Sequence, residues 1–395
     1  MRFRRFALAF FLLLIPGILA VPAAADMEVV RTEAGSIALG GVVQAGLTTF
    51  LGDEIPVVGR QQLASLDLSS IPTGNRSATW RFATSRGKDR EFTLDALRLR
   101  ASGTILRGRV RFFAQASFVD QVTLLDLRLD LRFIPYTWFH IGRFAPALTF
   151  FGAREPEDLY LIDWPLMDVD PFGHAIHSFP FRDTGVEVDV GVPYFRARMG
   201  LFNGQDAPLT GDNNTAKDLL VTLTLSPPVE GFGLQGGYRY GLALNEVASL
   251  VVDGRFKERN DASQTFVGSL WYTPRLGPIL VGEVAYGVYN PTTQTLKTRR
   301  KLSWYALAGF DFWRLTGLPV QLLGRYDTMD PDFNVSRDEN RVLTAGINYS
   351  FEGTHARVAL NYLRRMEAFR VVGPDGRLRR GFRHDELKLQ VQAAF

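Results

Sequence analysis

Hydrophobic and polar residues alternate along most of the chain, so that every second side chain is apolar. In the stretch 125–133, leucines and a phenylalanine occupy the odd positions, and aspartates and arginines occupy the even positions between them. The stretches 343–351 and 387–395 repeat this period of two. Successive side chains of a β-strand point to opposite faces, so this period predicts strands with one apolar face.

Sixteen segments carry the pattern. Most are about 10 residues long, which is the length that a tilted strand needs to cross a bilayer. The sixteen segments lie near 35–51, 91–102, 108–119, 123–134, 137–145, 183–191, 193–203, 217–227, 231–243, 264–273, 278–290, 302–313, 318–328, 341–352, 355–366 and 383–395.

The connections between these segments alternate between short and longer ones. Short links such as 135–136 and 228–230 follow every second strand, while 52–90, 146–182 and 367–382 are among the long links. Short periplasmic turns and long external loops are typical of bacterial outer-membrane barrels, and an even strand number returns both ends to the periplasmic side. The sequence therefore predicts an all-β fold, a transmembrane antiparallel β-barrel of about 16 strands.

A soluble β-sandwich or propeller is the alternative fold. Apolar and polar residues also alternate along its strands, but its polar face is exposed to solvent and is usually rich in lysine and glutamate. Here the polar positions hold mainly arginine, aspartate, glutamine, serine and glycine. Sixteen amphipathic strands would also need a second layer to cover their apolar face. We therefore favour the barrel.

The first 25 residues form a separate unit. Arg2, Arg4 and Arg5 precede an apolar run from Phe6 to Ala20, and small residues at 23–25 follow it. This order is that of a secretory signal peptide, with the barrel formed by residues 26–395. The strand that ends at Phe395 resembles the C-terminal assembly signal of bacterial outer-membrane proteins, which supports a location in the outer membrane.

Composition and charge narrow the function further. The chain has 395 residues and no cysteine, which excludes a disulfide framework, cysteine zinc sites, thiol catalysis and covalent haem attachment. The formal net charge is +4, but the predicted signal peptide contains three arginines and no acidic residue. The mature chain is then close to neutral, at about +1, because 42 basic residues face 41 acidic ones.

Four stretches resemble the phosphate-selective porins of the O/P type. They are FTLDALRLRASGTILRGRVRFFAQASF at 92–118, WFHIGRFAPALTFFG at 138–152, RDTGVEVDVGVPYFRARMGLFNG at 182–204 and the ending HDELKLQVQAAF. The resemblance covers most of residues 90–395. It implies a sixteen-stranded barrel in the outer-membrane lipid, usually a homotrimer, whose pore is narrowed by an infolded third loop, here the segment 146–182.

The resemblance is incomplete at the positions expected to recognise phosphate. Those porins carry a lysine cluster at the mouth, whereas this chain has only six lysines, and Arg143 and Ala145 replace a glutamine and a lysine of their motif. The family therefore does not identify phosphate as the solute. A related group of barrels sheathes multihaem cytochromes, and a sheath of this kind is the alternative function.

If the apolar positions face lipid, the positions between them face the channel. The inward basic candidates are Arg98, Arg100, Arg109, Arg111, Arg128, Arg132, Arg196, Arg198, Arg239, Arg325 and Arg357. The inward acidic candidates are Asp126, Asp130, Glu187, Asp189, Glu283, Asp311 and Asp327. Arginine stays charged at any relevant pH, so an arginine column on the second to fourth strands would attract anions. Alternatively, these arginines pair with acidic residues of neighbouring strands and only stiffen the wall.

Other kinds of site have little support in the sequence. His174 and His177 lie three residues apart near Asp168 and Asp170, but polar loop residues explain them adequately. Asp327, Asp330 and Asp332 lack the glycine turn and the bidentate glutamate of a calcium loop. No motif of a hydrolase, zinc protease or nucleotide-binding enzyme occurs, and the arginines form no single solvated patch for nucleic acid. We therefore expect no enzyme activity, no cofactor and no metal.

The sequence thus predicts an outer-membrane porin. It would allow passive diffusion of small hydrophilic solutes, with a weak preference for small anions, through a pore narrowed by the segment 146–182.

Overall fold

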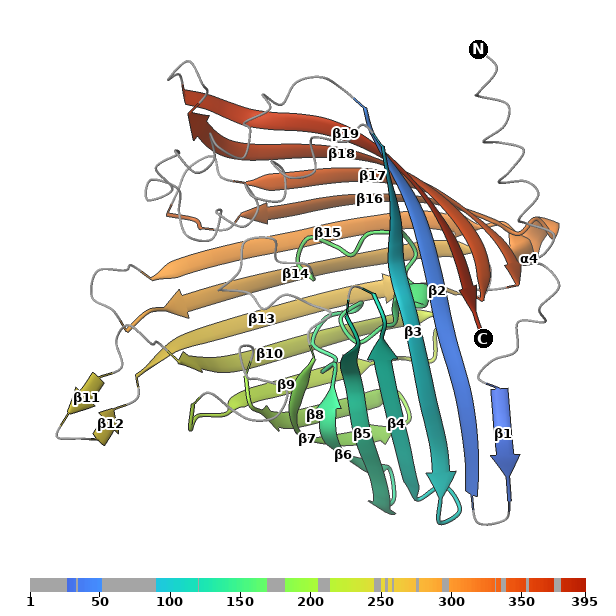
Figure 1. Ribbon diagram of the computed structural model, residues 1–395, viewed down its shortest axis with the longest axis vertical. Coiled ribbons are helices and arrows are strands. Elements are labelled where there is room, and N and C mark those ends of the chain that lie inside the picture. The colour runs from blue at the N-terminus through green and yellow to red at the C-terminus, as the bar shows by residue number, and fades with distance from the viewer. Residues whose placement is uncertain are drawn as a thin grey trace.

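Sixteen antiparallel strands close into a barrel in the computed structural model (Figure 1). The described residues are 27–32, 35–51, 90–119, 121–168, 182–204, 214–244, 250–252, 255–257, 259–274, 277–292, 298–330, 332–334, 339–352, 355–372 and 378–395. The predicted signal peptide 1–25 lies outside them. The all-β barrel of sixteen strands predicted from the sequence is confirmed.

The strands of the barrel follow one another around the ring in chain order. They are β2 (Gly35–Leu51), β3 (Arg90–Ile105), β4 (Val110–Ser117), β5 (Thr123–Ile134), β6 (Thr137–Phe144), β7 (Asp183–Val192), β8 (Phe195–Phe202), β9 (Asp218–Leu225), β10 (Phe232–Leu244), β13 (Asn260–Tyr272), β14 (Pro278–Asn290), β15 (Arg299–Asp311), β16 (Val320–Asp330), β17 (Asn340–Glu352), β18 (Ala356–Val372) and β19 (Leu378–Ala394).

The barrel closes where the last strand meets the first. β19 pairs with β2 from Asp385 opposite Leu51 to Ala394 opposite Val42. The terminal Phe395 extends this ladder, because its amide donates to the carbonyl of Gly41 (2.9 Å) and its carbonyl accepts from the Gly41 amide (2.8 Å). Closure leaves no open edge among the barrel strands, which an apolar medium requires.

Five small elements were not predicted from the sequence. β1 (Met27–Arg31) pairs with the start of β2, and the hairpin of β11 (Leu250–Val252) and β12 (Arg255–Lys257) lies within the predicted loop 244–263. The short helix α4 (Trp313–Thr316) forms the turn between β15 and β16, and η3 (Pro156–Asp158) lies within the segment 146–182. None of them carries an alternation long enough to recognise.

Two predicted boundaries were wrong. The predicted loop 367–382 is mostly strand, because β18 and β19 continue their ladder as far as Val372 opposite Leu378. Arginines interrupt the apolar alternation there, so the sequence pattern ends before the backbone pairing does. Arg109 was predicted inside a strand that begins at 108, but β4 begins at Val110 and Arg109 lies in the β3–β4 turn.

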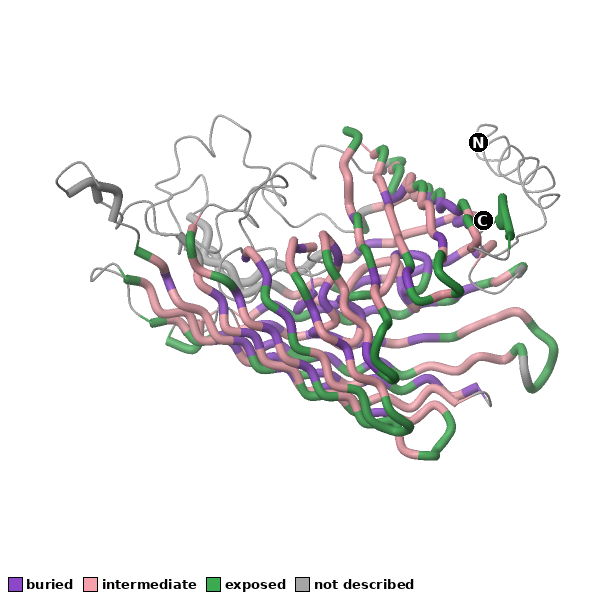
Figure 2. Tube along the Cα trace, turned by 90° about the horizontal axis from the view of Figure 1, so that it is seen from below, coloured by how far each residue is buried: buried purple, intermediate pink, exposed green. Residues whose placement is uncertain are grey.

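The two faces of the barrel differ in the side chains they carry. Along β17, Leu343 and Ile347 are 45% and 49% exposed, whereas their neighbours Thr344 and Asn348 are fully buried. The same alternation of buried and exposed residues recurs on other strands (Figure 2). Other exposed outward residues include Leu223, Leu270, Leu280, Val284 and Leu322. An apolar outer surface of this extent indicates contact with lipid.

In the described ranges, no helix is both long enough and apolar enough to cross a membrane.

A charge on the outer face tests this orientation. Ile347 lies near the middle of β17 and points outward, so Ile347→Arg would place a guanidinium in the lipid. We expect the free energy of unfolding from lipid vesicles, measured by urea titration, to fall by about 2–4 kcal/mol. Ile347→Leu is the matched control and should stay within about 0.5 kcal/mol of the parent protein. If the arginine variant were as stable as the leucine variant, this face would not contact lipid.

Candidate functional site

The chain after β6 enters the barrel and lies across its interior. We call residues 145–168 the inner segment (Figure 1); they include every described residue of the predicted segment 146–182 except Arg182. Polar side chains of the wall donate hydrogen bonds to its carbonyl groups: Gln235 to Leu148 (2.9 Å), Asn348 to Tyr160 (2.7 Å) and Arg357 to Leu159 (2.6 Å). These contacts come from β10, β17 and β18, so the inner segment spans a wide arc of the wall.

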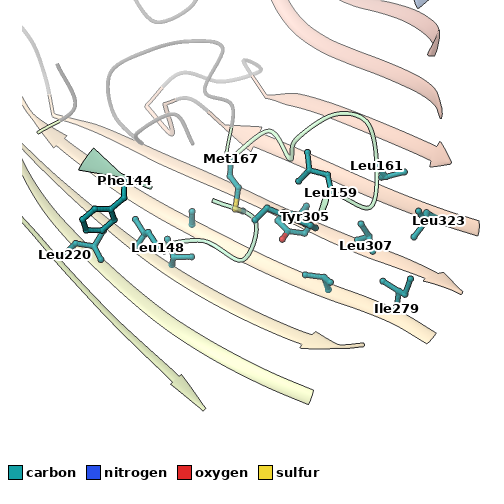
Figure 3. Packing of buried hydrophobic residues seen from close by; sticks show 14 of the residues in the cluster. Phe144, Leu148, Leu159, Leu161, Met167, Leu220, Ile279, Tyr305, Leu307 and Leu323 are labelled. Carbon is teal, nitrogen blue, oxygen red and sulfur yellow. The ribbon is translucent and has the colours of Figure 1, made fainter. Parts of the chain in front are cut away.

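Apolar packing holds the inner segment against β13–β16. Its buried side chains are Leu148, Phe151, Leu159, Leu161 and Met167, and they form one cluster with Val267, Ile279, Val281, Tyr305, Leu307 and Leu323 of the wall (Figure 3). Gly237 allows the close approach, because a Cβ at this position would lie 2.6 Å from the Leu148 side chain. Part of the inward face is therefore apolar and covered rather than open to the channel.

Carboxylates of the inner segment pair with cations of the wall. Glu155 accepts from Arg98 and Glu157 accepts from Arg100, both at 2.7 Å. On β19, which only β2 separates from β3, Lys388 lies 2.8 Å from the Asp163 carboxylate. The arginine column predicted on the second to fourth strands is therefore partly neutralised by the inner segment and not only by neighbouring strands.

Two carboxyl groups of the inner segment lie in opposite electrostatic environments. Burial alone would raise the pKa of Asp163, but the cations of Lys388 and Arg365 outweigh it and hold this pKa below its usual value. For Asp168, burial raises the pKa well above its usual value, and the nearby Glu283 carboxylate adds to the effect. Asp168 accepts a hydrogen bond from Thr149 (2.6 Å) within the segment. Asp163 thus anchors the segment as an ion, whereas Asp168 favours the neutral form.

Four of the predicted inward acidic residues are buried on β5 and β7. Asp126 pairs with Arg182 at 2.8 Å, and Asp130 pairs with Arg128 at 2.7 Å. Asp189 accepts from Arg196 at 2.7 Å and from Arg198 at 3.3 Å. His140 lies between two of these carboxylates, 2.6 Å from Asp130 and 3.4 Å from Asp189. Glu187 is also buried and lies next to this network.

Three of the predicted arginines are exposed and form no ion pair in the described part of the chain. Arg109, Arg111 and Arg132 are exposed, at or near the end of the barrel that carries the short turns. The guanidinium of Arg111 lies 4.1 Å from the centre of the Trp138 ring, and that of Arg132 lies 4.8 Å from it. A cation over an indole face is held in place while it keeps its charge.

An open chamber of about 810 Å³ lies between Arg132 and the inner segment. The turn residues Pro135, Tyr136 and Tyr194 place it at the short-turn end of the barrel. The charged residues that line it are four arginines and one aspartate: Arg132, Arg154, Arg196, Arg198 and Asp189. Asp189 already binds two of those arginines. The chamber therefore has a positive lining.

The described residues contain no group of three or more histidines, aspartates or glutamates placed to hold a metal ion. Asp327 of the sequence-derived calcium candidate binds Arg325 at 2.8 Å instead. His174, His177 and Asp170 lie outside the described residues.

Sequence reasoning missed the residues that the inner segment contributes. Arg154, Glu155 and Glu157 occupy a loop without periodicity, and no pattern in that loop predicts which wall residues they meet. One signal for the packing was present: Ile279, Leu280 and Val281 are consecutive apolar residues in β14. A strand that is apolar on both faces is covered on both faces, and the inner segment covers the inward one.

Comparisons with known proteins agree with the fold. The anion-selective porin from Comamonas acidovorans superposes with a TM-score of 0.61 and 12% sequence identity, over 91% of this chain and 100% of that one. The outer-membrane channel DcaP of Acinetobacter baumannii gives a TM-score of 0.60 at 9% identity, over 93% of this chain and 99% of that one. OmpT of Vibrio cholerae gives a TM-score of 0.56 at 10% identity, over 94% of this chain and 100% of that one.

No protein-family model matches the sequence, and no curated protein matches it. At identities of 9–12%, the structural similarity establishes the fold alone. The chain thus has the sixteen-stranded barrel fold of bacterial outer-membrane porins.

Proposed function

We propose that this protein is an outer-membrane porin that lets small hydrophilic solutes diffuse passively and prefers anions weakly. The observation that carries the proposal is the positive chamber inside a closed barrel whose outer face is apolar. The barrel satisfies its backbone hydrogen bonds in lipid, and the chamber supplies a polar interior for solutes. The mechanism needs no reacting group, and we propose no enzymatic activity.

The anion preference rests on arginines without carboxylate partners. Arg98 and Arg100 are neutralised by Glu155 and Glu157, so they contribute little to the field. Arg111, Arg132 and Arg154 form no ion pair with a carboxylate in the described residues, and Arg196 is half exposed beside Asp189. Unpaired guanidinium groups in a water-filled constriction raise the local concentration of anions. The preference therefore originates at the chamber rather than along a column on β3–β5.

We also propose that the segment 146–182 constricts the pore. Its described part packs against one side of the wall and forms the boundary of the chamber through residues such as Thr149, Phe150 and Arg154. It also occupies space that a threaded multihaem cytochrome would need. For this reason we favour a porin over an electron-transfer sheath.

Three further features predicted from the sequence are also proposals. They comprise the signal peptide 1–25, the similarity to the O/P type of porin and a homotrimeric assembly. The last is supported by the fold, since one of the similar structures is a trimer form of OmpT from Vibrio cholerae. The interior gives no reason to single out phosphate as the solute.

The reversal potential in a KCl gradient across a planar bilayer tests the selectivity. We expect the protein to conduct chloride better than potassium. The double variant Arg132→Gln, Arg154→Gln removes two unpaired charges from the chamber, and the permeability ratio should fall roughly two- to fivefold because salt screening leaves each charge a contribution of about 0.2–0.5 kcal/mol.

Arg341→Gln is the control for this measurement. Arg341 pairs with Glu339, and its neighbours Asn340 and Val342 are the inward-facing residues of β17, so its loss should leave the ratio unchanged. A protein that conducts potassium better than chloride would contradict the proposed preference.

The Asp163 anchor tests the role of the inner segment in the pore. Asp163→Asn removes the charge that Lys388 and Arg365 bind, which should weaken the anchor by about 1–3 kcal/mol. At neutral pH we expect the open-channel current of the variant to fluctuate at least about ten times as often as that of the parent protein.

The pH dependence of these fluctuations provides the check. Because the pKa of Asp163 is lowered in the folded protein, its contribution is complete above the usual carboxyl range and is lost only as the pH falls through the lowered value. The parent protein should therefore resemble the variant only in strongly acidic solution. If parent and variant are equally quiet at neutral pH, Asp163 does not hold the constriction.

A further inference from the structure

Aromatic rings face the chamber beside its arginines, and the diffusion of small ions does not explain them. Trp138 of β6, Phe150 of the inner segment and Trp271 of β13 all line it. Phe150 and Trp271 also pack against the apolar cluster of the inner segment, and Trp138 stacks on Arg111 and Arg132, but an inorganic ion gains no apolar contact from the rings that line the chamber. A ligand that has an apolar face as well as a charge would use both kinds of residue.

The rings and the guanidinium groups are arranged in adjacent pairs. Arg132 lies 4.8 Å from the centre of the Trp138 ring at one wall. Arg154 lies 4.1 Å from the centre of the Phe150 ring, which is itself 5.2 Å from the centre of the Trp271 ring. The aromatic faces of Phe150 and Trp271 are thus tilted toward each other next to a cation. Planar apolar groups pack on such faces in offset or edge-to-face geometry.

The strands β5 and β8 supply hydrogen-bond donors through Arg132 and Arg196. Arg196 binds Asp189 through Nε and Nη2, while its side chain stays 49% exposed. A guanidinium has five N–H groups, so this pairing leaves donors directed to the chamber. Arg132 offers a complete fork, since it pairs with no carboxylate in the described residues. Such forks bind carboxylates in a bidentate manner.

We propose that the chamber is a binding site for aromatic carboxylates on their way through the pore. The carboxylate binds Arg132 and Arg196, and the ring packs on Phe150 and Trp271. A volume of about 810 Å³ lies within the usual range for small-molecule sites, roughly 300–1,000 Å³. This inference rests on the proposed function, because it names the solute class that the anion-preferring pore would favour.

Block of the chloride current in single channels tests the site. Benzoate, cyclohexanecarboxylate and acetate are titrated in turn from the side that carries the short turns. All three carry one carboxylate, and the first two have rings of similar size. We expect benzoate to block at roughly tenfold lower concentration than acetate because its ring is buried, and at lower concentration than cyclohexanecarboxylate because only a flat ring stacks.

Trp271→Leu separates stacking from charge. It should weaken block by benzoate about three- to tenfold and leave block by acetate unchanged. Trp271→Phe should keep most of the benzoate block. Trp164→Leu is the matched control: Trp164 also belongs to the inner segment's apolar cluster but does not line the chamber, so its loss should change neither block.

The two proposals fail in different ways. The aromatic site is overturned if benzoate and cyclohexanecarboxylate block the channel equally, or if benzoate blocks the Trp271→Leu variant as strongly as the parent protein. The chloride preference would still stand. If the channel prefers potassium, the anion-selective porin is overturned, whatever the benzoate result. Preferential benzoate block that is lost in Trp271→Leu and retained in Trp164→Leu supports the site.

Discussion

The structure depends on one constraint: every backbone amide and carbonyl that meets lipid must be paired within the barrel. An unpaired peptide group in an apolar medium costs several kcal/mol. Pairing of β19 with β2 removes the last open edge, and Phe395 extends it to the end of the chain through its two bonds to Gly41. Because the ring is complete, the outward side chains can be apolar throughout. The inward side chains are then free to carry charges that no lipid-facing position would tolerate.

Closure alone would leave a wide interior with many unpaired arginines. The inner segment fills part of this interior and pairs with some of the cations. It brings Glu155 and Glu157 to β3 and Asp163 to β18 and β19, so the carboxylates come from a loop and the cations from the wall. Its leucines and Phe151 cover the apolar inward face of β13–β16. Each cation that the segment neutralises is removed from the field of the pore. The arginines that it does not reach, among them Arg132, therefore determine where anions are attracted.

The sequence predicted the barrel well, because the alternation of side chains and the alternation of loop lengths both follow from the strand geometry. β5 and β14 lie within the predicted limits.

The sequence predicted poorly the features that depend on contacts between distant segments. The eighteen predicted inward residues could be assigned to strands, apart from Arg109 in its turn, but their partners could not. Arg98 meets Glu155 and Asp126 meets Arg182 across gaps of 57 and 56 residues, and no periodicity encodes such pairs. β18 and β19 extended beyond their predicted ends because backbone pairing tolerates arginines that break the apolar pattern.

The chamber combines charge with aromatic rings because its lining comes from two sources, the strands of the wall and the inner segment. The wall contributes Arg132, Arg196 and Trp138 at positions fixed by the strand register, whereas Phe150 and Arg154 arrive with the inner segment. A loop can change its side chains without disturbing the ladder that closes the barrel, since its backbone is held by only a few bonds from the wall. The barrel therefore sets the outer limit of the pore, and the inner segment narrows it and adds side chains that help to decide which solutes gain from passing through it. Aromatic carboxylates gain most when both contributions face the same cavity.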